Sequence, residues 1–493
     1  MTEPSVASVS ADDAQLRALG YSAKFDRSMS LWENFALGFT YLSPVVGVYS
    51  VFAGSLQAAG PPFIWSYLLA GAGQMLVCLV FSEIVAQYPI SGGLYPWTRR
   101  LVGKRWAWMA GWVYGWALFT TIAAVATGAA PFLADFLGFE ATPGVIAAVG
   151  LALVLIATLL NLAGTRLLAR VALFGFICEL LGALAVGIYL FLFQQHNPLA
   201  IVLDPGLKPV EGSYLPAFLA GATAGLFCCY GFEACADVAE ETPNPGLRIP
   251  RAMRMTIYIG IAAAFFVCLA LLVALPNLAD AISGKEPNPL PALLKSAFGP
   301  IGSKLVILVV MVSFLSCVLS LQAAVSRLLF AYGRDRMIAG HGALTKLSAQ
   351  HVPWIALVVA GLIPGVIIVL GMFLQDAIQT IINAAVAGIY LAFQMVVIAA
   401  LYARSRGWRP AGAFSLGTWG LAVNVAALVY GIGALSNIMW PRTPDQPWYV
   451  NFGMLATIGG IVIAGFAYMA AARTHDRGEA PAGDAWHPAQ VPQ

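Results

Sequence analysis

The sequence predicts an all-α membrane protein with twelve transmembrane helices, and three observations lead to this prediction. The 493 residues are 60% hydrophobic and only 10% charged, whereas soluble domains average about 25% charged residues. The mean hydropathy is +0.81. The apolar residues gather in twelve runs, and each run approaches or exceeds the roughly 20 residues that cross the core of a bilayer.

Short segments rich in charged residues, glycine and proline separate the apolar runs and mark where each helix ends. Runs 106–135 and 301–330 are longer than a bilayer requires, so we expect these helices to be tilted or to extend beyond the lipid. The expected spans lie, in chain order, at 33–57, 62–87, 106–135, 143–163, 168–193, 213–238, 253–275, 301–330, 353–373, 379–403, 415–438 and 449–472.

The placement of the basic residues predicts how the chain is oriented. Of the 26 lysines and arginines, 21 fall in the two tails and in every second connecting segment. The remaining five are Lys208, Lys285, Lys295, Lys304 and Arg442. Because segments rich in Lys and Arg stay on the cytoplasmic side, we expect a multi-pass protein of the cell (plasma or inner) membrane with both termini in the cytoplasm.

The cysteines and histidines argue against an enzyme or a metal site. All seven cysteines lie in apolar spans, and the five histidines lie in connecting segments or the tail. Neither a disulfide framework nor a buried histidine site is therefore expected. The chain also has no GxxxxGK[ST] run for binding ATP. We expect no catalytic residue, cofactor, metal or nucleic-acid partner, and the sequence leaves the oligomeric state open.

The sixth expected span, 213–238, is interrupted and carries acids. Gly225 and Gly231 weaken its middle, and Glu233 and Asp237 follow four residues apart, on one face if that part is helical. Each carboxylate inside an apolar span costs roughly 2.5–3.5 kcal/mol on insertion scales. Such a span is typical of a broken helix whose freed backbone and acids bind a polar solute.

The first expected span has a matching interruption, where Ser43, Pro44 and Gly47 occupy its midpoint. Pro44 removes one backbone hydrogen bond of the helix. Interrupted spans that lie five apart, in corresponding positions of two halves, indicate a binding site between inverted repeats.

Three stretches of the chain together resemble the amino acid–polyamine–organocation superfamily, most closely its amino acid/choline transporter branch. They are GFEACADVAEETPNP at 231–245 with IPRA at 249–252, YPISGGLY at 88–95, and SRLLFAYGRDR at 326–336. The resemblance implies a five-plus-five inverted-repeat bundle of the leucine-transporter type plus two extra helices. The implied divisions are an N-terminal segment (1–32), two repeats (33–193 and 213–403), a final helix pair (415–472) and a tail (473–493).

The resemblance further implies a secondary transporter that works by alternating access. Its solute would lie between the breaks of spans 1 and 6, which carry over as the unwound residues Ser43 to Gly47 and Phe227 to Tyr230, including Cys228. Glu233 would be the acid after the second break. Carriers of this superfamily commonly have a hydroxyl residue where this chain has Val45, Val46 and Gly47. This departure argues against a standard α-amino acid and favours an amine, a choline-like solute or an ω-amino acid. The expected solute is therefore an amino acid, an ω-amino acid or a small amine.

The coupling ion is expected to be a proton, with sodium as the alternative. Burial in an apolar span penalises the charged form of a carboxyl group, so Glu179 is predicted as a proton carrier, unless it is simply bonded to a neighbouring helix. Glu233 and Asp237 could bind an ammonium group or relay protons. Ser316 could face a sodium site or join two helices. Trp116, Phe227 and Tyr230 could hold an ammonium head group or act as packing residues.

The sequence also gives expectations for the membrane edges. Glu240 and Glu241 are expected to form a charge cluster beside Arg248 and Arg251, and Glu83 to do the same near Arg99. The proline-rich segment 276–300 is either a cover over an outer vestibule or a plain surface loop, and the tail from Arg473 is expected to be disordered. Alternative functions are a choline, ethanolamine or polyamine carrier or exchanger, a nutrient sensor, a channel, or an intramembrane enzyme.

Overall fold

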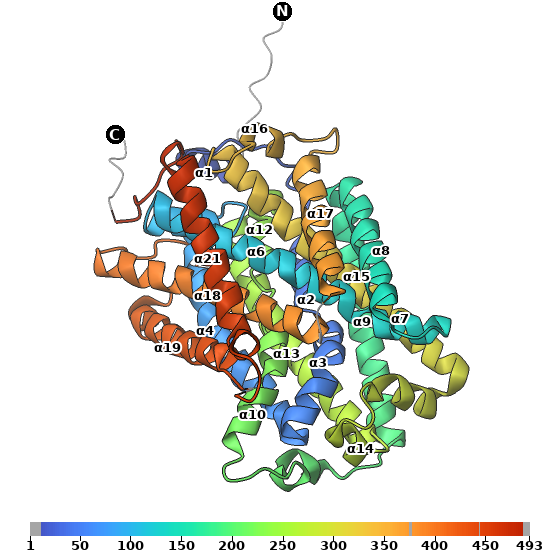
Figure 1. Cartoon of the computed structure of the whole chain (residues 1–493). Coiled ribbons are helices and arrows are strands. Elements are labelled where there is room, and N and C mark those ends of the chain that lie inside the picture. Colours follow the sequence, from blue (N-terminus) through green and yellow to red (C-terminus); the bar gives the residue numbers. More distant parts are fainter. Residues whose placement is uncertain (1–10, 374–376, 443, 487–493) are drawn as a thin grey trace, which may run out of the picture.

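The computed structural model describes residues 11–373, 377–442 and 444–486, and these ranges contain helices and loops but no strand (Figure 1). Within them, eleven helical stretches are long and apolar enough to cross a membrane. They are built from α2 (Leu31–Leu42) with α3 (Pro44–Ala59), η1 (Pro61–Ile64) with α4 (Trp65–Gln87), α6 (Lys104–Gly128) with α7 (Ala130–Leu137), α8 (Pro143–Leu162), α9 (Thr165–Phe193), α13 (Pro245–Ala274), α15 (Pro289–Arg334), α17 (Trp354–Gly371), α18 (Ala377–Ser405), η5 (Gly417–Trp419) with α19 (Gly420–Met439), and α21 (Gly453–Ala472).

The sixth expected span, 213–238, is broken and is therefore not among these eleven. It consists of α10 (Leu215–Gly221), α11 (Thr223–Cys228) and α12 (Ala234–Asp237), followed by the 3₁₀ turn η4 (Ala239–Glu241). Each piece is too short to cross a membrane alone, which is why this segment does not add to the eleven continuous spans. The interruption predicted from Gly225, Gly231 and the acids is therefore confirmed.

Helix contacts repeat between the two halves of the chain. In the first half α4, α6 and α8 pack against α13, α15 and α17, which are their counterparts in the second half. The last helix of the first half, α9, packs on α2, α13 and α15, and its counterpart α18 packs in the same way on α11, α4 and α6. Such reciprocal contacts are what a pseudo-twofold, inverted repeat produces, and they place the two broken segments together at the centre.

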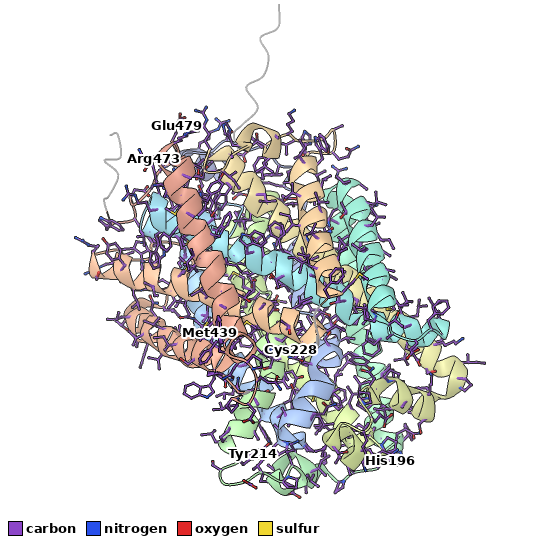
Figure 2. All side chains as sticks on the ribbon, viewed as in Figure 1. His196, Tyr214, Cys228, Met439, Arg473 and Glu479 are labelled. Atoms are coloured by element: carbon purple, nitrogen blue, oxygen red, sulfur yellow. The ribbon has the colours of Figure 1, made fainter. Side chains whose placement is uncertain are left out.

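The two ends of the bundle carry different short elements. Figure 2 shows Arg473 and Glu479 at one end and His196 and Tyr214 at the other. The first end, here called the terminal face, also carries α1 (Ala11–Ala18), α5 (Leu94–Leu101), α16 (His341–Leu344) and η6 (Thr474–Asp476). The opposite end, the far face, carries η2 (Leu199–Leu203), η3 (Pro205–Leu207), α14 (Leu278–Ser283) and α20 (Trp448–Asn451).

Two connecting segments are more regular than a plain loop or a disordered tail, and the expectation of a disordered tail was wrong. The proline-rich segment 276–300 is largely helical, because α14 lies in it and α15 begins at Pro289 and turns sharply at Gly299, where φ is 68°. The tail from Arg473 is ordered through Trp486 in the described residues. The backbone N–H of Gly483 donates to the carbonyl of Arg99 at 2.9 Å, and that of Ala485 donates to the carbonyl of Arg100 at 3.3 Å. The tail thus gains on α5 the backbone partners that its own sequence does not provide.

Candidate functional site

The first broken segment turns at a single residue. Ser43 has φ 42° and ψ 90°, and α3 begins at once with Pro44. The prediction that Ser43 to Gly47 are all unwound was therefore wrong, because Val45, Val46 and Gly47 form the first turn of α3. A proline at the first helical position has no N–H to lose and has a φ suited to the helix, so the chain resumes its helix immediately after the break.

The sixth segment is interrupted over Cys229 to Glu233, between α11 and α12. Phe227 and Cys228 are still helical, so the predicted break at 227–230 lies about two residues too early. Gly231 has φ 112°, and a Cβ atom there would lie 2.6 Å from the backbone nitrogen of Leu42. Only glycine accepts this backbone conformation readily and leaves room for α2 to approach.

The two breaks meet at the centre of the bundle, as predicted. A Cβ atom on Gly47 would lie 2.3 Å from Sγ of Cys228, and the rings of Tyr41 and Tyr230 are 6.2 Å apart in an edge-on arrangement. We call this place the crossing, and it comprises Ser43–Gly47 and Cys228–Glu233. Its predicted residues are all buried; the side chains of Ser43, Val45, Val46, Phe227, Cys228, Tyr230 and Glu233 are each at most 5% exposed.

Glu179 of α9 lies against the first break, a placement that the sequence did not reveal. Its Oε1 atom accepts hydrogen bonds from the Ser43 hydroxyl at 2.7 Å and from the Val45 backbone N–H at 2.9 Å. Its Oε2 atom has no hydrogen-bond partner among the described residues, although the side chain is only 1% exposed. A buried carboxyl group with one free oxygen therefore caps the start of α3.

The hydroxyl of Ser43 lies at the break itself, although Val45, Val46 and Gly47 carry none. It accepts a hydrogen bond from the Val46 N–H at 3.2 Å, as the cap of a helix does. A serine followed directly by proline is a sequence signature of a helix start. That signal could have shown that a hydroxyl lies at the break although Val45, Val46 and Gly47 have none.

Two serines of α15, Ser316 and Ser320, contact neighbouring helices. Ser316 packs against Gly175 of α9, one turn before Glu179, where a glycine Cβ would lie 2.1 Å from the Ser316 hydroxyl. Ser320 and Thr40 share a hydrogen bond of 2.8 Å. The Ser320 bond therefore joins α15 to α2.

Glu233 and Asp237 converge on Tyr114 of α6, a residue that sequence reasoning missed. The Tyr114 hydroxyl lies 3.4 Å from Oε1 of Glu233 and 3.3 Å from Oδ2 of Asp237. The second oxygen of Glu233 accepts the Gly231 N–H at 2.8 Å. A phenol has one proton to donate, so if both carboxyl groups bond to it, one of them must itself donate a proton.

Trp116 is the predicted site residue that the structure does not bring to the crossing. It lies on the other side of α6 from Tyr114, in a row with Trp112 at 5.9 Å and Phe119 at 6.0 Å between ring centroids. Trp112 in turn stacks on Tyr468 of α21 at 5.8 Å. Trp116 therefore belongs to the packing of the final helices. Phe227 does reach the site, because its ring is 5.9 Å from that of Tyr230.

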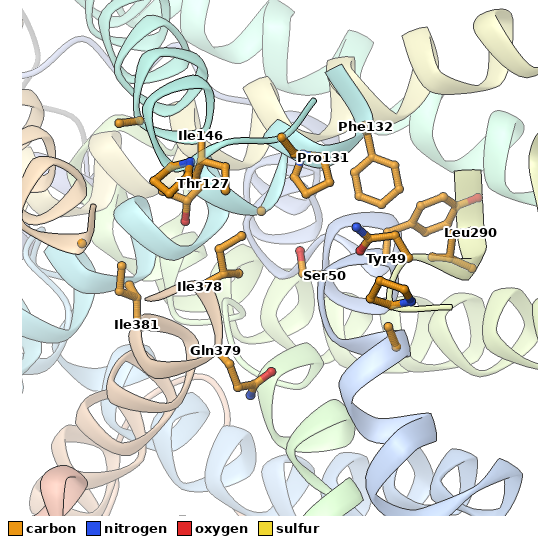
Figure 3. A pocket seen from close by; sticks show the side chains of 18 of the residues that line it. Tyr49, Ser50, Thr127, Pro131, Phe132, Ile146, Leu290, Ile378, Gln379 and Ile381 are labelled. Atoms are coloured by element: carbon orange, nitrogen blue, oxygen red, sulfur yellow. The ribbon is translucent and has the colours of Figure 1, made fainter. Parts of the chain in front are cut away.

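A cavity of about 450 Å³ lies between the crossing and the far face. Figure 3 shows Ser50 from α3, Thr127 from α6 and Gln379 from α18 around it. Its wall also includes Pro287 to Pro291, which decides in favour of the prediction that segment 276–300 covers a vestibule. The rings of Tyr49 and Phe132, 5.6 Å apart, also line it. We call this cavity the vestibule.

On the terminal face, buried ion pairs join two of the three stretches that carry the family resemblance, and hydrogen bonds of Ser91 add the third. Glu240 pairs with Arg334 at 2.7 Å and Glu241 with Arg327 at 2.9 Å. The expected partners Arg248 and Arg251 were wrong, because the end of α15 lies directly over η4. The Ser91 N–H donates to Glu240 at 3.2 Å, and the Ser91 hydroxyl accepts from the Glu240 N–H at 3.0 Å.

A second set of contacts surrounds Asp335, just after α15. It accepts hydrogen bonds from Tyr95 at 2.8 Å and from Tyr21 at 3.2 Å, and Arg99 lies 3.8 Å away. Burial and the charge of Asp335 raise the pKa of Tyr21 above its ordinary value, so its hydroxyl stays protonated as a donor. Glu83 does not pair with Arg99 as expected; it pairs with Arg404 and accepts the Leu416 N–H at 2.7 Å.

Comparison with known proteins agrees with this geometry. A model of an amino acid permease family matches residues 29–470. The chain belongs to this amino acid permease family. It is 26% identical to the amino-acid permease BAT1 of Arabidopsis thaliana, over 91% of this chain and 92% of the relative. It is 25% identical to amino-acid permease 2 of Neurospora crassa, over 94% and 88%, and 26% identical to the branched-chain amino acid permease BcaP of Lactococcus lactis, over 71% and 76%.

Membership of the amino acid permease family makes the chain a multi-pass membrane protein and an amino acid transporter. Paired breaks in corresponding helices of two repeats are typical of secondary transporters.

Proposed function

We propose that this permease moves an amino acid together with a proton by alternating access, with Glu179 as the proton-carrying group. The two repeats, 33–193 and 213–403, would move relative to each other around the crossing. The observation that carries the proposal is the contact of Glu179 with Ser43 and Val45. Glu179 forms hydrogen bonds at the bend between α2 and α3. Its protonation can therefore change how these two helices are held relative to each other.

The closed terminal face and the vestibule indicate to which side of the membrane this conformation is open. Buried ion pairs seal the terminal face, whereas the vestibule leads toward the far face. If the termini are cytoplasmic, as the basic residues predict, the structure corresponds to the state that takes up solute from outside the cell. The return step would open the contacts of Arg327 and Arg334 with the end of the sixth segment.

The vestibule favours amino acids whose side chains are uncharged. None of the lining residues that the structure describes is charged, and apolar ones such as Leu290, Ile368 and Ile381 form much of the wall. The three membrane acids are engaged with groups of the protein itself, through Ser43, Tyr114 and Gly231. A polyamine or choline would meet no charged residue in the described lining of the vestibule, so we place such cations second.

The test is uptake into liposomes that contain the purified protein. Radiolabelled neutral amino acids are supplied with and without an inward proton gradient, and sodium is varied separately. We expect the gradient to drive accumulation in the wild type and not in Glu179→Gln. Glu140→Gln changes an exposed acid and is the matched control. Accumulation driven by sodium alone, or a gradient effect that survives in Glu179→Gln, would reject the proton role of Glu179.

A further inference from the structure

The start of α3 has no free N–H group in this conformation. Pro44 has none to offer, and the Val45 N–H donates to Glu179 at 2.9 Å. The Val46 N–H donates to the Ser43 hydroxyl at 3.2 Å, and the Gly47 N–H donates to the Ser43 carbonyl at 2.8 Å. The Ser43 hydroxyl donates its own proton to Glu179 at 2.7 Å.

Glu179 is the one partner in this set that comes from another helix. The positive end of a helix binds carboxylates well, because N–H groups and the helix dipole both favour negative charge. Here α3 is 16 residues long, and the acid at its start is a side chain of the protein, 1% exposed and with Oε2 unpartnered among the described residues. An incoming solute carboxylate can reach this helix start only if Glu179 gives up its bonds.

We propose that Glu179 and the carboxylate of the solute take turns at the start of α3, so that Glu179 makes the permease specific for carboxylated solutes. This inference rests on the proposed proton coupling. When a proton adds to Glu179, its charge-assisted bonds become ordinary ones and weaken. The solute carboxylate then accepts from the Val45 N–H and the Ser43 hydroxyl. One proton and one carboxylate enter together, so the net charge at the helix start stays the same.

No strong charge competes with Glu179 from the helices around it. Four helices pack on α9, namely α2, α8, α13 and α15. α8 has no charged residue, and the charges of α13 are the arginines 248, 251 and 254 near its start. α2 has one charged residue, Glu33, in its first turn. The charged residues of α15 are Lys295 and Lys304 toward its start and Arg327 and Arg334 toward its end, each at least ten residues from Cys317, whose thiol lies close to Glu179. α2 and α3 also contribute the phenols Tyr41 and Tyr49. Among the described residues, no ion pair includes Glu179.

The experiment compares solutes that differ only in the carboxylate. Purified full-length protein is titrated by calorimetry between pH 5 and pH 8 with L-leucine and L-phenylalanine, and with 3-methylbutylamine and phenethylamine, their decarboxylated counterparts. For the wild type we expect the affinity for amino acids to fall as pH rises, by at most about tenfold per pH unit, as one linked proton allows. In Glu179→Gln we expect that dependence to vanish, and the amines should show none in either protein.

Ser43→Ala provides a second variant that keeps the titrating acid. We expect this variant to bind the two amino acids more weakly and to bind the amines with unchanged affinity. The pH dependence of amino acid binding should remain. Equal pH dependence for amines and amino acids would overturn the inference and leave proton coupling in place. If the wild type binds amino acids with equal affinity at every pH, the proposed proton coupling itself is rejected. Amine binding without amino acid binding, or no binding of either amino acid, also overturns the inference.

Discussion

Arg327 and Glu241 form a two-point ion pair between the end of α15 and the end of the sixth segment. Nε of Arg327 lies 2.9 Å from Oε1, and Nη2 lies 3.1 Å from Oε2. Both side chains are only 1% exposed. The pair ties the end of α15 to the segment that carries the break, so in the proposed cycle it would open when solute leaves through the terminal face.

Removing one partner of this pair should weaken the closed terminal face. Breaking a buried ion pair typically costs about 3–5 kcal/mol, because a charge is left buried without its partner. We expect Glu241→Gln to lower the thermal stability and to increase labelling of cysteines introduced behind the pair. Arg336→Gln breaks an exposed pair with Glu479 and is the control, with an expected effect of about 0–1 kcal/mol. Unchanged labelling in Glu241→Gln would show that other contacts hold the face shut.

Gly231→Ala should impair the protein more than other glycine substitutions. The new Cβ atom would lie 2.6 Å from the Leu42 nitrogen, in addition to the strain of φ 112°. Gly138→Ala is the matched control, because Gly138 also has a positive φ, of 76°, but has nothing within 4 Å of the added atom. The left-handed strain alone costs about 1–2 kcal/mol. Thermal unfolding and uptake of the two variants give the comparison, and equal losses would contradict a close approach at the crossing.

Tyr114→Phe should disturb the sixth segment without removing an acid. The change takes away the hydroxyl that bonds both Glu233 and Asp237, and a buried polar group left without its partner costs about 1–3 kcal/mol. We expect slower uptake and a changed pH profile. Tyr189→Phe removes a hydroxyl that bonds the Ala297 carbonyl near the far face, and serves as the control. An unaltered pH profile in Tyr114→Phe would leave the two acids with only a structural role.

Truncation after Arg477 should loosen the terminal face. It removes the carbonyl groups of Ala480 and Pro481, which accept hydrogen bonds from Arg99 at 2.6 and 3.3 Å. It also removes Asp484, whose carboxylate pairs with Arg100 at 3.0 Å. Asp484→Asn alone should cost about 0–1 kcal/mol because that side chain is partly exposed. Hydrogen exchange of α5 measures the effect, and equal protection with and without the tail would contradict it.

Much of the architecture followed from the sequence because its signals are local. Run lengths, glycines and prolines predicted the spans, and the acids of the sixth segment predicted its break. The partners were harder to foresee, because they come from distant parts of the chain. Tyr114 meets Asp237, and Ser43 meets Glu179, only through the fold. Trp116 was misplaced for a related reason, since an aromatic residue on a membrane helix does not show which face it lies on.

The bend at Ser43 concentrates the flexibility of the first segment in one pair of backbone torsion angles. The helices on either side, α2 and α3, are otherwise regular, so each can rotate as a rigid body about Ser43. A motion of this kind need not unravel any turn of helix. The two ends of the segment can therefore respond separately, one to the seal on the terminal face and the other to whatever enters from the opposite end.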